Sequence, residues 1–314
     1  MLDSGLTLTN GEALLDEVFD QAYAESIAAE GATEGKSTDS MLFKQVPVTG
    51  NTYTTQQFQP GGYFAQKAEN QPVPQATSRT GNSISTVINE FSQEQLISRT
   101  FMDDDRTRFG VTQLMIRKMA KRARVTSDRY MFGLLRGAFG TTDTNDGVDW
   151  GSNAHVRLDG GAVDNLETGV LTPTNLETGI TSFLQQPSQD GVRESKMPKL
   201  LVVPIALLRE AYEITDSVLR PGTAQNEINY VSKAWPGLEI RFSAFVGAAE
   251  SGTDTQWHLL GEDHSARRLI RESLWTRLID WGTSATNQYS YKAGYRESRK
   301  VESYEQSLHS NGTV

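Results

Sequence analysis

The feature that most constrains the fold is the stretch 44–138, in which a long polar segment with several glycines runs directly into one long basic helix. The polar segment carries few large apolar side chains with which to pack on its own protein. A two-stranded hairpin without such packing is only marginally stable in water. We therefore expect this segment to be held in place by other copies of the chain.

The polar segment predicts two strands joined by a loop. Residues 44–59 and 83–91 place β-branched and aromatic residues among Thr, Gln and Ser, which is typical of strands. Glycines and prolines between them indicate a loop. A disordered insertion is the alternative, but disordered segments are poor in aromatic and β-branched residues. We expect an ordered arm that lies on a neighbouring subunit, with a loop tip formed by Phe58, Gly61, Gly62, Tyr63, Phe64 and Lys67.

The residues from about 103 to 138 predict a long amphipathic helix. Apolar residues recur at three- and four-residue spacing from Val111 to Leu135, and glycines follow. The three aspartates at 103–105 are predicted to cap the start of the helix, where carboxylates favour the positive end of its dipole. Between Arg106 and Arg136 there are nine basic residues and one acid, in a chain whose net charge is −9.

The centre of this helix carries the strongest chemical signal in the chain, the basic residues Arg117, Lys118, Lys121, Arg122 and Arg124. Three interpretations stay open: a solvated face, a face that pairs with acidic segments of the same or a neighbouring chain, and contact with nucleic acid phosphates. The amphipathic helix near the N-terminus supplies acidic partners of suitable density, namely Glu12, Asp16, Glu17 and Asp20. A pI near 5.1 and the lack of a base-reading motif argue against a dedicated nucleic-acid binder.

Composition excludes several classes of protein. The 314 residues contain no cysteine, which excludes disulfides and thiol chemistry. There is no run of eighteen apolar residues and no charged-then-apolar leader, so we predict a soluble protein made in a cytoplasm, with no membrane span.

We predict no catalytic, cofactor or metal site. The four histidines His155, His258, His264 and His309 are too far apart in sequence to match a zinc motif. The segment 31–37 has three residues between its glycines where a phosphate-binding loop needs four. Scattered Ser, His and Asp residues show no nucleophile motif.

The remainder of the chain predicts an α+β protein. Residues 199–204 form a continuous apolar strand that leads into a helix at 205–215, and strands are predicted at 237–243 and 257–260. The segments 268–281 and 288–300 predict strands and a closing helix rich in Tyr and Arg.

Taken in order, these elements resemble the major capsid protein of tailed bacteriophages, with the fold named after phage HK97. The resemblance is carried by the acidic N-terminal helix, the hairpin arm, and three segments that read DDDRTRFGVTQL, KLLVVPIALLREAYEI and WGTSATNQYSYKAGYRESRKV. It implies an N-terminal arm at 1–40, an extended loop at 41–98, a peripheral domain with its spine helix at 99–190, an axial domain at 191–264, and a return to the peripheral domain at 265–314.

The resemblance also implies a structural role. It implies assembly into hexamers and pentamers of an icosahedral head around double-stranded DNA, a virion shell assembled in the host cytoplasm, and portal, scaffolding or decoration proteins as partners. The shell would contact the packaged DNA through non-specific contacts at most. Two other classes stay open: an α+β enzyme or ligand-binding protein with an unrecognised pocket, and a DNA-associated protein that uses the basic helix.

Overall fold

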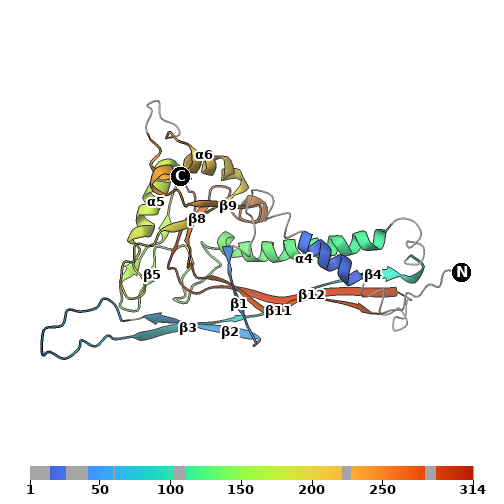
Figure 1. Ribbon diagram of the computed structural model, residues 1–314, viewed down its shortest axis with the longest axis horizontal. Helices are drawn as coiled ribbons and strands as arrows, with labels where there is room; N and C mark the ends of the chain where they lie inside the picture. The colour runs from blue at the N-terminus through green and yellow to red at the C-terminus, as the bar shows by residue number, and fades with distance from the viewer. Residues whose placement is uncertain are drawn as a thin grey trace.

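The computed structural model describes residues 15–25, 42–59, 61–101, 110–220, 228–279 and 288–313. The molecule is elongated (Figure 1): a long sheet lies beneath helix α4, a second sheet with its helices stands above one end, and a hairpin projects from that same end. The chain exposes 17224 Å². A compact protein of this mass would expose roughly 13,000 Å².

The long sheet has four strands in the order β1-β11-β12-β4. Strand β11 (Ala266–Ile279) pairs antiparallel with β12 (Gln288–Val301), which pairs antiparallel with β4 (Asn89–Ser98). Strand β1 (Lys44–Pro47) lies parallel to the other edge of β11. The closing helix predicted within 288–300 is therefore wrong, because this segment forms the central strand β12 between two partners.

Helix α4 (Val111–Arg136) lies over this sheet. It begins at Val111, later than predicted, because its N-cap Gly110 has a left-handed conformation (φ 61°), and no acidic residue lies in its first turn. The aspartates at 103–105 lie outside the described residues. At its far end the helix stops at Gly137, as the glycines predicted.

Residues 15–25 form a helix that packs beside the first half of α4. Its apolar face, with Leu15 and Phe19, joins Ile116 and Met119 of α4 and Tyr291 of β12 in one buried cluster. This cluster anchors the N-terminal helix to its own protomer.

The second sheet has five strands in the order β7-β13-β10-β8-β9. Its members come from distant parts of the chain: β7 (Leu166–Glu167), β8 (Pro198–Pro204), β9 (Glu239–Ser243), β10 (Trp257–Gly261) and β13 (Ser307–Ser310). One face packs against α5 (Pro173–Gln185), α6 (Leu208–Asp216) and α7 (Tyr230–Ala234). The other face packs against the end of α4, through Leu200, Val202 and Leu260 against Met131 and Leu135.

The projecting hairpin consists of β2 (Thr52–Gln59) and β3 (Arg79–Val87), which pair antiparallel from Thr52↔Val87 to Gln59↔Arg79. Both predicted strands are divided in the structure: 44–59 forms β1 and β2, and 83–91 covers the end of β3 and the start of β4, so only β2 and β3 belong to the hairpin. A short two-stranded ladder, β5 (His155–Val156) with β6 (Ala162–Val163), lies close to the loop end of the hairpin.

Candidate intersubunit surfaces

The hairpin is attached to its own protomer by polar contacts along one face of β2. Alternate residues of a strand point the same way, and here Tyr53, Thr55 and Gln57 all face the body. The Tyr53 hydroxyl donates to Glu302 Oε1 (2.9 Å) and the Thr55 hydroxyl donates to Asn145 Oδ1 (2.9 Å). Burial, followed by this bond to Glu302, raises the pKa of Tyr53 to about 12.

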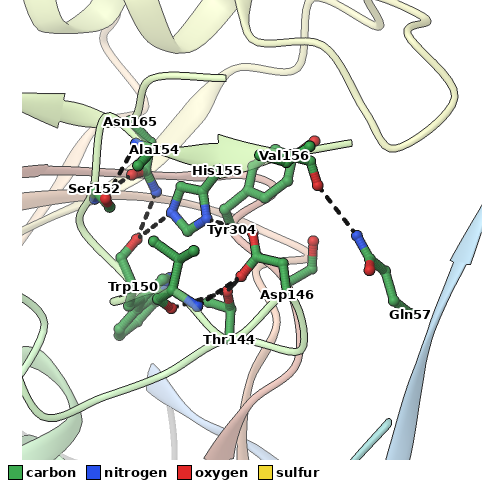
Figure 2. Close-up of polar contacts among 12 residues, drawn as sticks. Gln57, Thr144, Asp146, Trp150, Ser152, Ala154, His155, Val156, Asn165 and Tyr304 are labelled. Carbon is green, nitrogen blue, oxygen red and sulfur yellow. Dashed lines mark hydrogen bonds and ion pairs between the residues drawn. The ribbon is translucent and has the colours of Figure 1, made fainter. Parts of the chain in front are cut away.

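Gln57 completes this row. Its Nε2 donates to Gln189 Oε1 (3.0 Å) and to the carbonyl oxygen of Val156 (3.4 Å), the second of which is drawn in Figure 2. No residue of β2 or β3 belongs to the buried apolar clusters, so the hairpin is attached to its protomer mainly by polar contacts.

The residues predicted to form the loop tip are strongly exposed, although Phe58 lies in β2, paired with Thr80, before the loop begins. The exposed fractions are 56% for Phe58, 70% for Tyr63 and 106% for Phe64, and Lys67 is exposed as well. Gly62 has φ 72°, a conformation that favours glycine, and the Tyr63 hydroxyl accepts a bond from Arg193 N (3.0 Å). Solvent-exposed aromatic side chains of this size are typical of a surface that a partner covers.

A cleft of about 340 Å³ lies between the hairpin and the body, and its only charged lining residues are acids. We call this the acidic cleft and define it by Asp146, Asp190, Glu194, Glu302 and Glu305. Glu302 has Arg267 as its partner (3.4 Å) and Glu194 has Lys196. Burial, together with the nearby carboxylates of Glu194 and Asp190, raises the pKa of Glu305.

Buried polar contacts behind the acidic cleft hold its wall in place (Figure 2). His155 Nδ1 lies 2.7 Å from Asp146 Oδ2, and His155 Nε2 lies 3.2 Å from the carbonyl oxygen of Trp150. Burial alone would raise the pKa of Asp146, but hydrogen bonds from His155 and Thr144 outweigh it, and the pKa is lowered. Asp146 therefore stays ionised and fixed, as a structural carboxylate.

The five basic residues predicted to share one face of α4 are divided by the structure. Arg117, Lys118, Lys121 and Arg122 are exposed, and we call these four the basic face. Arg124 is 4% exposed and its Nε contacts Asp128 Oδ2 at 3.1 Å, one helical turn away. The prediction is therefore wrong for Arg124, because its position turns it toward the sheet, where it needs a buried counter-ion.

The predicted acidic partners lie close to α4 but use other contacts. The Tyr291 hydroxyl donates to Asp16 Oδ1 (2.8 Å), and Asp20 lines a cavity shared with Arg124. Glu17 is exposed, and Glu12 lies outside the described residues. Among the residues that the structure describes, no ion pair joins these acids to the basic face. The helix at 15–25 is held mainly by its apolar side.

The acidic cleft was missed by sequence reasoning. Its residues come from four separate segments, 56–58, 144–146, 188–194 and 302–305, and no spacing in the sequence joins them. Two of the histidines, His258 and His309, also meet only in the fold, as partners on β10 and β13. Within the described part of the chain, no three His, Cys, Asp or Glu side chains are grouped so as to hold a metal ion.

No helix in the described residues is long and apolar enough to cross a membrane. The profile of a family described as phage capsid protein matches residues 83–303. No curated protein matches the sequence.

Solved capsid structures share the fold at low sequence identity. The mature capsid protein of bacteriophage PhiM1 matches with a TM-score of 0.56 and 11% identity, over 87% of this chain and 86% of that one. The capsid protein of cyanophage P-SCSP1u gives a TM-score of 0.54 and 13% identity, over 86% of each chain. A virus-like particle from Pyrococcus furiosus gives a TM-score of 0.52 and 9% identity, over 93% of this chain and 98% of that one.

Three parts of the structure together define the HK97-like capsid fold. They are the extended hairpin, the long helix over a four-stranded sheet, and the second sheet with its helices. The chain belongs to the phage capsid protein family. It is a structural major capsid protein, and its place is the multi-subunit shell of a virion.

Proposed function

We propose that this protein assembles into hexamers and pentamers, which form the icosahedral head of a tailed phage around double-stranded DNA. The observation that carries the proposal is the match of the capsid family profile to residues 83–303, which includes most of the long sheet and all of α4. The weakly attached hairpin and the large exposed surface support it, because both need further copies of the chain to become buried.

Within this proposal each part of the chain has a role. Residues 1–40 are the N-terminal arm, 41–98 the extended loop, 99–190 and 265–314 the peripheral domain, and 191–264 the axial domain. The loop tip, from Phe58 to Lys67, lies on a neighbouring subunit. Portal and scaffolding or decoration proteins complete the head in the host cytoplasm, and the packaged DNA is met without sequence preference. The shell itself catalyses no reaction.

Purification of the recombinant protein tests the proposal directly. We expect light scattering and negative-stain electron microscopy to show shells, sheets, or capsomers of five and six subunits. An enzyme would usually give a small closed oligomer, and a DNA-associated protein would give a salt-sensitive shift with DNA. A monodisperse monomer of 34.7 kDa at every protein and salt concentration would reject the proposal.

A further inference from the structure

Two surfaces of opposite charge lie far apart on the protomer. The acidic cleft lies between the body and the loop end of β2, and the basic face lies on the first half of α4. In Figure 1 the hairpin projects from one end of the molecule, whereas α4 begins near the other end. The two surfaces of one chain therefore cannot reach each other.

The acidic cleft is built to receive a cation. Five carboxylates line it without any Lys, Arg or His among the lining residues. His155, Lys196 and Arg267 outside it pair with Asp146, Glu194 and Glu302, which leaves Asp190 and Glu305 without an ion pair among the described residues. The hydroxyl of Tyr304, a fully buried side chain in the wall, has no hydrogen-bond partner among the described residues. Neighbouring carboxylates repel one another in a partly buried cleft, and an ammonium or guanidinium group that enters it would relieve that repulsion.

The basic face has the complementary properties. None of its four residues forms an ion pair with any other residue that the structure describes. Leu114 and Val125, which are 51% and 47% exposed, lie at helical spacing beside Lys118 and Lys121. The rim of the acidic cleft carries the exposed ring of Phe58. Apolar side chains among charges favour a protein partner, because phosphates offer nothing with which to bury them.

We propose that the basic face of one copy docks against the acidic cleft of the next copy, and this inference rests on the proposed assembly into a shell. The contact is between two different surfaces of identical chains, so repetition gives a ring when the rotation closes. It also places the hairpin of each copy beside α4 of its neighbour.

Charge reversal with rescue tests this pairing. The basic-face variant is Arg117→Glu with Lys121→Glu, and the cleft variant is Asp190→Lys with Glu194→Lys. We expect each variant alone to fold, as judged by circular dichroism and a cooperative melt, and to give about tenfold less assembled protein, because like charges across an interface are strongly unfavourable. The chain with all four changes should recover assembly, since its reversed surfaces match again.

Matched controls separate this outcome from others. Glu262→Lys with Asp263→Lys reverses two exposed acids in the turn between β10 and β11, neither of which lines the cleft, and should assemble normally. If the cleft variant fails to fold, Asp190→Asn with Glu194→Gln removes the same two negative charges without adding positive ones and nearly keeps the side-chain size. This variant should still lower the assembled fraction.

Three results would overturn the pairing. Normal assembly of either single-surface variant would do so, and so would folded single variants whose combination shows no recovery. Normal empty shells of the basic-face variant with salt-sensitive loss of DNA would assign the face to DNA instead. If the unmodified protein forms no assemblies at all, the proposed function itself fails, which is a separate result.

Discussion

At the residue scale, the clearest consequence of the fold is a buried histidine pair. The Nδ1 atoms of His258 and His309 lie 2.9 Å apart, so one ring donates and the other accepts, and at most one of these two nitrogens carries a proton. Both side chains are fully buried, and their Nε2 atoms have no partner among the described residues. Burial lowers the pKa of His258 to about 3 and the pKa of His309 well below its usual range.

This pair predicts loss of stability in acid. An unfolded histidine has a pKa of about 6.5, so below that pH the unfolded chain binds more protons than the folded one. The free energy of unfolding should then fall by about 1.4 kcal/mol per pH unit for each such histidine. The variant His258→Leu with His309→Leu should flatten this dependence in urea unfolding of unassembled protein between pH 7.5 and 5. His264, whose pKa is lowered to about 4 by burial, is unchanged in this variant and will keep its own contribution to the pH dependence. Parallel pH profiles for the two proteins would contradict the assignment.

The ion pair of Arg124 and Asp128 gives a second prediction at this scale. Both residues lie one turn apart on α4 and are buried. Asp128→Ala should lower the free energy of unfolding by about 3–5 kcal/mol, because it leaves a buried guanidinium without its carboxylate. Arg124→Met with Asp128→Leu should cost clearly less, since it removes both charges. Urea denaturation of the three proteins checks this, and a double variant less stable than the single one would contradict it.

At the scale of elements, sequence reasoning succeeded where one physical signal dominated. The apolar spacing of α4 and its terminal glycine predicted the helix and its end, whereas Gly110 moved the start beyond the expected position. The prediction for the segment 288–300 was partly wrong, because its Tyr, Arg, Lys and Glu residues do not show the alternation of apolar and polar residues that indicates a strand. Pairing on both edges, and ion pairs such as Arg268 with Glu297 (2.7 Å), make it a central strand despite that composition.

The hairpin gives the prediction at this scale. Replacing residues 60–78 with Asn-Gly keeps the ladder, which ends at Gln59↔Arg79, and also keeps the contacts of Tyr53, Thr55 and Gln57. The protomer should stay folded, since no described residue of the removed loop belongs to the buried clusters. Assembly should fail, because the exposed rings of Tyr63 and Phe64 are lost. Circular dichroism, thermal melts and light scattering check both parts. Loss of the cooperative melt would instead show that the loop belongs to the protomer's own core.

At the scale of the whole molecule, the order of elements was enough to predict the fold class and the capsid family. Of the two proposed intersubunit surfaces on the hairpin side, the sequence suggested only the loop tip, as a cluster of aromatic residues within one segment. The acidic cleft could not be predicted, because only the tertiary fold brings Asp146, Asp190 and Glu305 together. The protomer exposes 17224 Å², about 4,000 Å² more than a compact chain of its mass.

That exposed surface predicts where assembly will stabilise the chain. An isolated two-stranded hairpin is marginal in water, so the amides of 52–87 should exchange quickly in the unassembled protomer and slowly in shells, where neighbours cover the hairpin. The amides of β10 and β13, which lie inside the five-stranded sheet, should exchange slowly in both states. Hydrogen exchange measured by mass spectrometry on shells and on dissociated protein checks this, with β10 and β13 as the internal control. Equal exchange of the hairpin in the two states would mean that it makes no contact between subunits, and the loop would then have to be assigned to the surface of the shell.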